Sequence, residues 1–200
     1  SDFNTALKLN KFDDRIYVWR AKFKNDLDQK KEALEDFNLA IKINPDNGLA
    51  YYFRSFIKYD FKDLKGSLED LNKVLEINPN NPVALYNRAV LLNEIGSLNQ
   101  ALDDFTKVAS LNPRNVLAWY NKGILNQQLG NLKAAINDYS KAIALYDDFY
   151  YAYLNRADAR TKLNDVLNAN ADFIKAQKIK QSNKDKQYAD SNKFKEPQLR

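Results

Sequence analysis

The chain has 200 residues, 44% hydrophobic and 28% charged, and a formal net charge of +5. It contains no histidine and no cysteine, which excludes disulfides, Ser-His-Asp and Cys-His nucleophile systems, and the usual His/Cys zinc sites. No run of about 18 apolar residues occurs, so the sequence predicts no membrane-spanning helix.

The dominant pattern in the chain is a repeat of 34 residues. The segment DFNTALKLN at Asp2 returns as DFNLAIKIN at Asp36, and Asn-Pro recurs at Asn44, Asn78 and Asn112. Because a repeat array buries its core between neighbouring repeats, we expect a solenoid over residues 1–183 without separate domains. Its five full repeats are 14–47, 48–81, 82–115, 116–149 and 150–183.

Residues 1–13 match the back half of a sixth repeat, since Phe3 stands where Phe37 stands one repeat later. We therefore expect residues 1–10 to form a second helix that lacks its first helix. This pattern favours a fragment of a longer array. The alternative is a natural cap, although a natural cap usually carries a polar outer face.

Each full repeat is predicted to form two amphipathic helices. Gly96 and Gly130 lie between the two apolar runs of their repeats and suit the left-handed conformation that ends a helix. The repeats close at Asn-Pro, but the fourth and fifth have Asp147 and Gln181 in place of proline, so we expect softer helix ends there. The apolar residues of the third repeat show the helical spacing: Val83, Leu85, Tyr86, Ala89, Val90 and Leu92, then Leu98, Ala101, Leu102, Phe105, Val108 and Ala109.

These positions resemble the tetratricopeptide repeat (TPR) family, which carries Trp-x2-Leu-Gly-x2-Tyr, then Ala-x3-Phe, then Pro in each repeat. The resemblance implies an all-α, right-handed superhelical solenoid of helix-turn-helix repeats, and a role as a protein-protein interaction scaffold. The matching residues are Trp119, Gly123, Ala135, Tyr139 and Ala142 in the fourth repeat, Leu85, Ala89, Ala101, Phe105, Val108 and Pro113 in the third, and Ala33, Phe37, Ala169 and Phe173 elsewhere.

The net positive charge lies at the C-terminal end of the chain. Residues 175–200 hold eight basic and three acidic side chains, which leaves 23 of each sign in the first 174 residues. A neutral array binds phosphates poorly, so we do not expect the repeats to bind nucleic acid. Residues 184–200 are interpreted as a basic tail or short capping helix. The alternative is a basic patch that contacts nucleic acid or an acidic partner.

Two charged columns run through the repeats, cationic at the seventh position and aspartate at the twenty-third. We expect structural ion pairs between them, within a repeat or between neighbours, because the planar guanidinium holds a carboxylate with two bonds. Arg88 should then contact Asp70 or Asp104. The alternative is that the arginines bind an acidic ligand. The columns are Arg20, Arg54, Arg88, Lys122 and Arg156, and Asp36, Asp70, Asp104, Asp138 and Asp172.

The concave face of such a solenoid is lined by the first helices and is the expected binding surface. Its middle repeats offer an aromatic and aliphatic strip beside a column of asparagines, whose carboxamides can donate to and accept from a peptide backbone. The alternative is that the tyrosines pack between first helices and the asparagines satisfy loop or helix-end groups. The expected partner-binding residues are Tyr52, Phe56, Tyr86, Asn87, Val90, Tyr120, Asn121, Ile124 and Asn155.

The sequence predicts no catalytic residue, no metal and no cofactor. Its carboxylate pairs, such as Glu35-Asp36, recur at the repeat period, which favours a structural role over a single active site. The Lys/Asn pair with which TPR proteins clamp chaperone C-terminal tails is absent, so such tails are disfavoured partners. We expect an extended peptide or amphipathic helix of a partner protein in the concave groove. The alternative is an architectural role, with self-association through the apolar face of residues 3–9.

Overall fold

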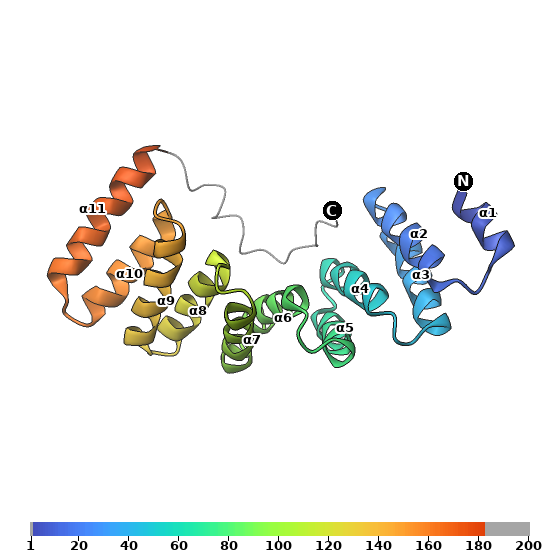
Figure 1. Ribbon diagram of the computed structural model, residues 1–200, viewed down its shortest axis with the longest axis horizontal. Coiled ribbons are helices and arrows are strands. Elements are labelled where there is room, and N and C mark those ends of the chain that lie inside the picture. Colours follow the sequence, from blue (N-terminus) through green and yellow to red (C-terminus); the bar gives the residue numbers. More distant parts are fainter. Residues whose placement is uncertain (1, 183–200) are drawn as a thin grey trace. The chain divides into compact units, whose positions relative to one another are not determined.

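The computed structural model describes residues 2–182, which form eleven α-helices and no strand (Figure 1). An all-α chain with two helices in each repeat was predicted, and the helices begin and end in step with the repeats. Their bounds are α1 (Asp2–Leu9), α2 (Asp14–Asp26), α3 (Lys30–Ile43), α4 (Gly48–Asp60), α5 (Leu64–Ile77), α6 (Pro82–Glu94), α7 (Leu98–Leu111), α8 (Val116–Gln128), α9 (Leu132–Leu145), α10 (Tyr150–Lys162) and α11 (Val166–Ser182).

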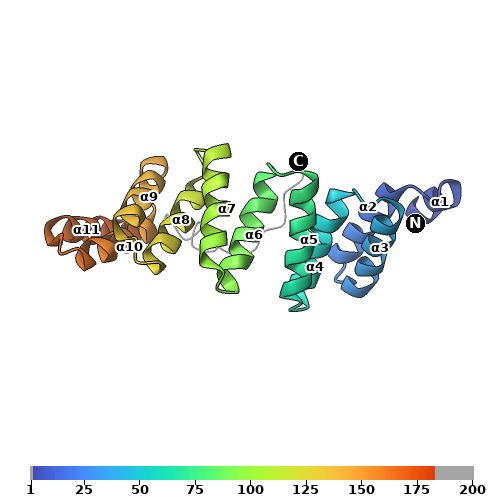
Figure 2. The same cartoon turned by 90° about the horizontal axis from the view of Figure 1, so that it is seen from below.

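The described chain falls into two compact units, residues 2–84 and 85–182, with the boundary inside α6. The physical reason is that each repeat contacts only its neighbours, so few contacts cross any one junction of the array. In the first unit α2 packs on α3 and α4 on α5 (Figure 2). In the second unit α8 packs on α9 and α10 on α11.

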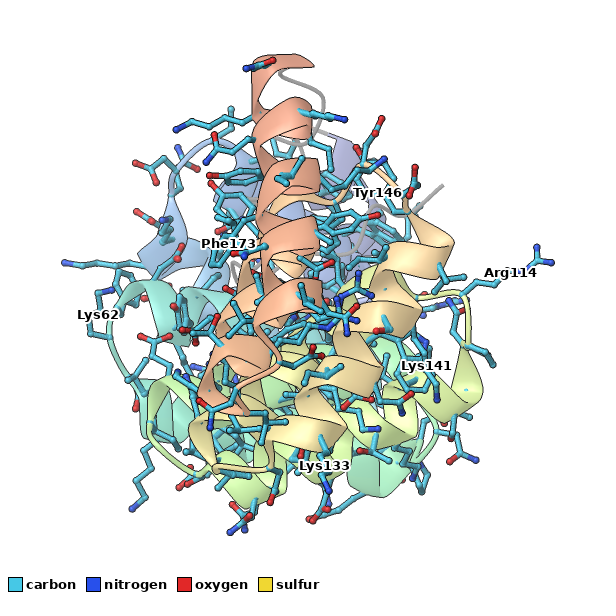
Figure 3. The ribbon with its side chains drawn as sticks, turned by 90° about the vertical axis from the view of Figure 1, so that its left-hand side faces the viewer. Lys62, Arg114, Lys133, Lys141, Tyr146 and Phe173 are labelled. Carbon is cyan, nitrogen blue, oxygen red and sulfur yellow. The ribbon has the colours of Figure 1, made fainter. Side chains whose placement is uncertain are left out.

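The turn inside every repeat contains one residue with positive φ, at positions 34 apart. Gly96 and Gly130 take φ of +80° and +79°, which is the left-handed conformation expected for them. The other three repeats place non-glycine residues there, namely Asp28, Lys62 and Asn164, at φ of 60°, 63° and 60°. Lys62 lies at the outer surface (Figure 3), where its Nζ is 5.7 Å from the centroid of the Tyr59 ring, a weak exposed contact.

Asparagine side chains begin several first helices. Asn47 Oδ1 accepts a hydrogen bond from the backbone N–H of Ala50 at 2.9 Å, and Asn115 Oδ1 accepts one from Ala118 at 2.9 Å. These bonds satisfy backbone donors that have no partner within the helix. Phe149 precedes α10 and makes no such side-chain bond.

Softer helix ends were expected for α9 and α11, because their repeats lack the closing proline. Only α11 is longer than the second helices of the other full repeats. Helix α9 ends at Leu145 after 14 residues, as α3, α5 and α7 do after theirs. Tyr146, which follows α9, donates its backbone N–H to Ala142 O at 3.0 Å, as Asn112 does to Val108 after α7. Helix α11 runs for 17 residues. The second helix of the fourth repeat therefore ends at the same position as in the first three repeats, although proline is absent.

The core of each repeat rests on small residues that let the two helices approach closely. Gly123 in α8 lies beneath the Tyr139 ring, and a Cβ at position 123 would lie 2.5 Å from Tyr139 Cε1. Ala101 and Ala135 are fully buried at one equivalent position of α7 and α9, and Ser67 takes that position in α5. Glycine and alanine at these positions follow from steric limits on the helix pair.

Candidate functional site

Each cation of the seventh-position column contacts the aspartate sixteen residues later in the same repeat. Arg88 Nε and Nη2 donate to the two carboxylate oxygens of Asp104, both at 2.7 Å. The sequence left open whether the pairs join helices of one repeat or of neighbours, and the contacts join the two helices of one repeat. The other pairs are Arg20 with Asp36, Arg54 with Asp70, Lys122 with Asp138 and Arg156 with Asp172.

A second donor, four residues after the first, contacts most of these aspartates and was not anticipated from the sequence. Lys24 Nζ lies 2.7 Å from Asp36 and Lys58 Nζ 3.0 Å from Asp70. The same position holds Asn126, Arg160 and, in the third repeat, the buried Leu92. The aspartates are buried and the cations are half-buried, so each cation supplies the counter-charge of a buried carboxylate.

The tyrosine and asparagine columns contact each other across neighbouring first helices. Asn121 Nδ2 donates to the Tyr86 phenol oxygen at 3.0 Å, and Asn155 Nδ2 donates to the Tyr120 phenol oxygen at 3.1 Å. Burial raises the pKa of Tyr86 and of Tyr120 to about 12, although the bonds from the asparagines act in the opposite direction. The tyrosines therefore match the alternative in which they pack between first helices, whereas the asparagines bond tyrosine phenols instead of the loop or helix-end groups expected for them.

The predicted partner-binding residues therefore divide into two sets by burial. Phe56, Val90, Ile124 and Asn155 are half-buried and so remain partly accessible to solvent. The buried set consists of Tyr52, Tyr86, Asn87, Tyr120 and Asn121. Sequence spacing placed all nine on first helices but could not separate the two sets, because the packing angle between neighbouring first helices decides which side chains are covered.

A hollow of about 330 Å³ lies in the second unit among α8, α9 and α10, and Ile124 and Asn155 line it together with Gln127, Gln128, Tyr139 and Lys162. Its inner wall is a hydrogen-bonded chain across these helices. The Tyr139 hydroxyl donates to Gln127 Oε1 at 2.8 Å, and Gln127 Nε2 donates to Asp158 Oδ2 at 2.6 Å. Lys162 Nζ lies 2.6 Å from the same carboxylate oxygen. The network links α8 to both α9 and α10 beside the hollow.

Two carboxamides on the rim of this hollow keep unused hydrogen-bonding atoms. Within residues 2–182, Asn155 Oδ1 accepts no hydrogen bond, and Gln128 makes none through its side chain. Both line the hollow together with Ile124. A peptide backbone needs such donors and acceptors next to an apolar contact.

Metal sites and membrane-spanning helices are two further features that bear on function. Residues 2–182 contain no group of three or more acidic side chains placed to hold a metal ion. No helix in that stretch is long and apolar enough to cross a membrane. The predicted basic tail, residues 184–200, lies outside the described residues.

Comparison with known proteins places the chain among repeat proteins. No protein of curated function matches its sequence significantly. Among solved structures, YrrB, described as a TPR protein with an unusual peptide-binding site, superposes with a TM-score of 0.83 at 18% identity, over 96% of this chain and 98% of that one. MamA from Desulfovibrio magneticus RS-1 gives 0.78 at 19% identity, over 86% and 97%.

A third solved structure, PilF from Pseudomonas aeruginosa, gives a TM-score of 0.67 at 16% identity, over 90% of this chain and 88% of that one. At these identities the likeness concerns the fold. Family models for the tetratricopeptide repeat match residues 14–47, 49–81, 71–103 and 116–149, which together cover more than half of the chain. The chain is an all-α solenoid that belongs to the tetratricopeptide-repeat family.

Proposed function

We propose that the chain is a non-enzymatic protein-interaction module that binds an extended segment or amphipathic helix of a partner protein along its first helices. Membership in a family of protein-interaction scaffolds supports the general role. The observation that carries the site is the hollow among α8, α9 and α10, because it combines an apolar side chain with backbone-binding groups on a rigid wall.

The proposal gives different tasks to the predicted residues of the second unit. Ile124 supplies apolar contact, and Asn155 Oδ1 and the Gln128 carboxamide are positioned to bond a peptide backbone. Tyr86, Tyr120 and Asn121 are buried, and Asn121 links α8 to α6 through the Tyr86 phenol oxygen. A peptide that meets these groups would form backbone bonds of little sequence specificity and one specific apolar contact.

A peptide-display selection on the folded chain tests this proposal. The library should contain extended and helix-forming peptides, and each recovered peptide should be tested against the variants Ile124→Asp and Ala134→Asp. Both substitutions add one negative charge, but Ala134 is exposed on α9 and does not line the hollow. The proposal predicts that Ala134→Asp retains binding and Ile124→Asp loses it.

Circular dichroism and thermal melting of both variants exclude an effect of unfolding. If Ile124→Asp is poorly folded, the double variant Gln128→Ala/Asn155→Ala tests the same surface through its polar groups. Retention of the peptides by a folded Ile124→Asp or double variant would place binding elsewhere on the chain and would refute the proposed site.

Self-association is a second candidate function, favoured by an apolar groove of about 770 Å³ between α1 and α2. Phe3, Ile16, Trp19 and Phe23 contribute to its lining, and 51% of Phe23 is exposed, whereas the equivalent Ile57 is buried. Light scattering across a range of protein concentrations tests this candidate. A mass that rises with concentration in the wild type, but not in Phe23→Glu, would support it, and a monomer at high concentration would refute it.

A further inference from the structure

A separate hollow of about 370 Å³ opens in the first unit, where α4 begins, α5 ends and the chain enters α6. Its lining is largely apolar, with Asn78 and Asn81 as the polar members. The lining residues are Gly48, Leu49, Tyr52, Val74, Ile77, Asn78, Asn81 and Val83. Leu49, Ile77 and Val83 are exposed, so the hollow faces solvent.

The repeat pattern shows what fills the equivalent space two repeats later. Val116, Tyr146 and Phe149 stand at the positions that Gly48, Asn78 and Asn81 occupy here. Phe149 is completely buried, and its ring centroid lies 4.6 Å from that of Tyr120, the equivalent of Tyr52. The fold therefore accommodates an aromatic ring against this tyrosine, and three smaller or more polar residues leave that space empty in the first unit.

The preceding repeat fills its equivalent space with a carboxylate. Asp14 stands where Gly48 stands, and its Oδ2 accepts hydrogen bonds from Asn44 Nδ2 at 2.8 Å and Asn47 Nδ2 at 2.7 Å. Asn78 and Asn81 are the equivalents of these two asparagines. Their Nδ2 groups donate to no residue within 2–182, because glycine replaces the carboxylate. Asn78 and Asn81 both line the hollow, so their amide groups are accessible to a ligand that enters it.

We propose that this hollow binds an aromatic side chain of a peptide partner, with the ring packed on Tyr52 and a peptide carbonyl oxygen accepting from Asn78 or Asn81. The ring takes the place that Phe149 takes in its own repeat, and the carbonyl takes the place of the Asp14 carboxylate. The inference adds a second subsite to the proposed peptide-binding function and rests on that function only for the class of ligand.

Nuclear magnetic resonance titration with single-residue probes tests the inference directly. The probe is N-acetyl-L-phenylalaninamide, and N-acetyl-L-alaninamide serves as the control because it has the same backbone without the ring. The phenylalanine probe should shift the backbone amides of Gly48, Leu49 and Val83 in a saturable way, with a dissociation constant on the order of millimolar, as expected for one side chain in a shallow site. The alanine probe should not.

The variant Gly48→Val copies the residue found two repeats later and fills part of the hollow. A Cβ at position 48 would lie 3.9 Å from Ile77 Cγ2, an ordinary contact, so the fold accepts the substitution. Saturable shifts from the phenylalanine probe should disappear in this variant while the melting temperature is kept or raised. Asn81→Phe is a second filled variant, which copies the residue at the position of Phe149.

Equal shifts from the two probes, no shifts from either, or full binding by folded Gly48→Val would overturn the inference. The variant Ile124→Asp separates this result from the proposed site in the second unit, since it lies outside the hollow. Probe binding that persists in Ile124→Asp while selected peptides are lost supports two subsites. Loss of probe binding in a folded Ile124→Asp would contradict an independent hollow.

Discussion

Asn121 and Tyr86 are 35 positions apart in the sequence, and the asparagine donates to the buried phenol oxygen at 3.0 Å. The bond joins α8 to α6 within the second unit. The same relationship joins Asn155 to Tyr120, from α10 to α8. Neighbouring first helices of the second unit are therefore linked by a repeated polar contact.

A double-mutant cycle on Tyr86→Phe and Asn121→Ala should give a coupling free energy of about 1 kcal/mol, because each single change leaves the other polar group buried without its partner. Urea unfolding followed by circular dichroism measures it. The cycle on Tyr120→Phe and Asn155→Ala serves as the comparison and should give a smaller value, since Asn155 is half-buried. Zero coupling in the first cycle would contradict a stabilising hydrogen bond between Asn121 and Tyr86.

Alkaline pH should destabilise the chain through the same tyrosines. Their pKa values rise from 10.0 to about 12 on folding, so the unfolded chain loses these protons first. The unfolding free energy that the protonated tyrosines contribute is fully present below pH 10. It declines as pH rises from 10 to 12, by on the order of 2 kcal/mol for each tyrosine. Unfolding free energies of the wild type and the Tyr86→Phe variant at pH 9, 10 and 11 measure the effect. The variant should show a flatter decline, and parallel curves would refute the assignment.

The ion pairs should differ in how much each cation contributes. Arg88 is the cation that contacts Asp104 among residues 2–182, whereas Asp172 contacts both Arg156 and Arg160. Arg88→Ala should therefore cost about 3 kcal/mol of unfolding free energy, because it leaves a buried carboxylate without a counter-charge. Arg156→Ala should cost about 1 kcal/mol. Chemical unfolding measures the loss of unfolding free energy in both variants. Equal losses would show that Arg160 does not compensate for the missing Arg156 side chain.

Ser67 should weaken the second repeat. Its hydroxyl is fully buried and has no hydrogen-bond partner within the described chain, while alanine occupies the equivalent positions 33, 101 and 135. Ser67→Ala should raise the unfolding free energy by about 1 kcal/mol, since it removes an unsatisfied polar atom without leaving a large cavity. Ala101→Ser is the reverse control and should lower it by a similar amount. A loss of stability in Ser67→Ala would indicate that the hydroxyl has a partner.

The left-handed turn residue of the second repeat offers a backbone test. Lys62 has φ of +63°, and glycine occupies the same position at Gly96 and Gly130. Lys62→Gly should stabilise the chain by about 0.5–1 kcal/mol, since glycine takes this conformation without steric cost. Lys62→Ala keeps the Cβ and is the matched control, which should change stability little. Thermal unfolding of the two variants distinguishes backbone strain from loss of the lysine side chain.

The repeat period was sufficient to predict the helix pairs, because spacing within 34 residues encodes the two apolar faces and the breaks at Gly96 and Gly130. The charged columns pointed to ion pairs, but the choice of Asp104 over Asp70 for Arg88 required the packing of one helix on another. The Tyr86–Asn121 contact was harder to foresee. A spacing of 35 combines one repeat with one residue of offset, and that offset follows from how neighbouring first helices pack.

The two hollows could not be read from any single column of the repeat. The hollow beside Tyr52 exists because Gly48, Asn78 and Asn81 are all small or polar in the same junction, and its character appears only beside Phe149 and Asp14 in other junctions. Cavities depend on the volume that several side chains leave together. Comparing the residues at these three positions among all repeats would have indicated the hollow from the sequence.

Binding of one selected peptide, measured by fluorescence anisotropy for the wild type, Ile124→Asp and Ala134→Asp, tests the central claim most directly. Contact between the peptide and the Ile124 side chain predicts at least about tenfold weaker binding for Ile124→Asp, equivalent to about 1.4 kcal/mol. Binding by Ala134→Asp should match that of the wild type. Equal affinities for all three folded proteins would contradict a peptide site on the first helices of the second unit.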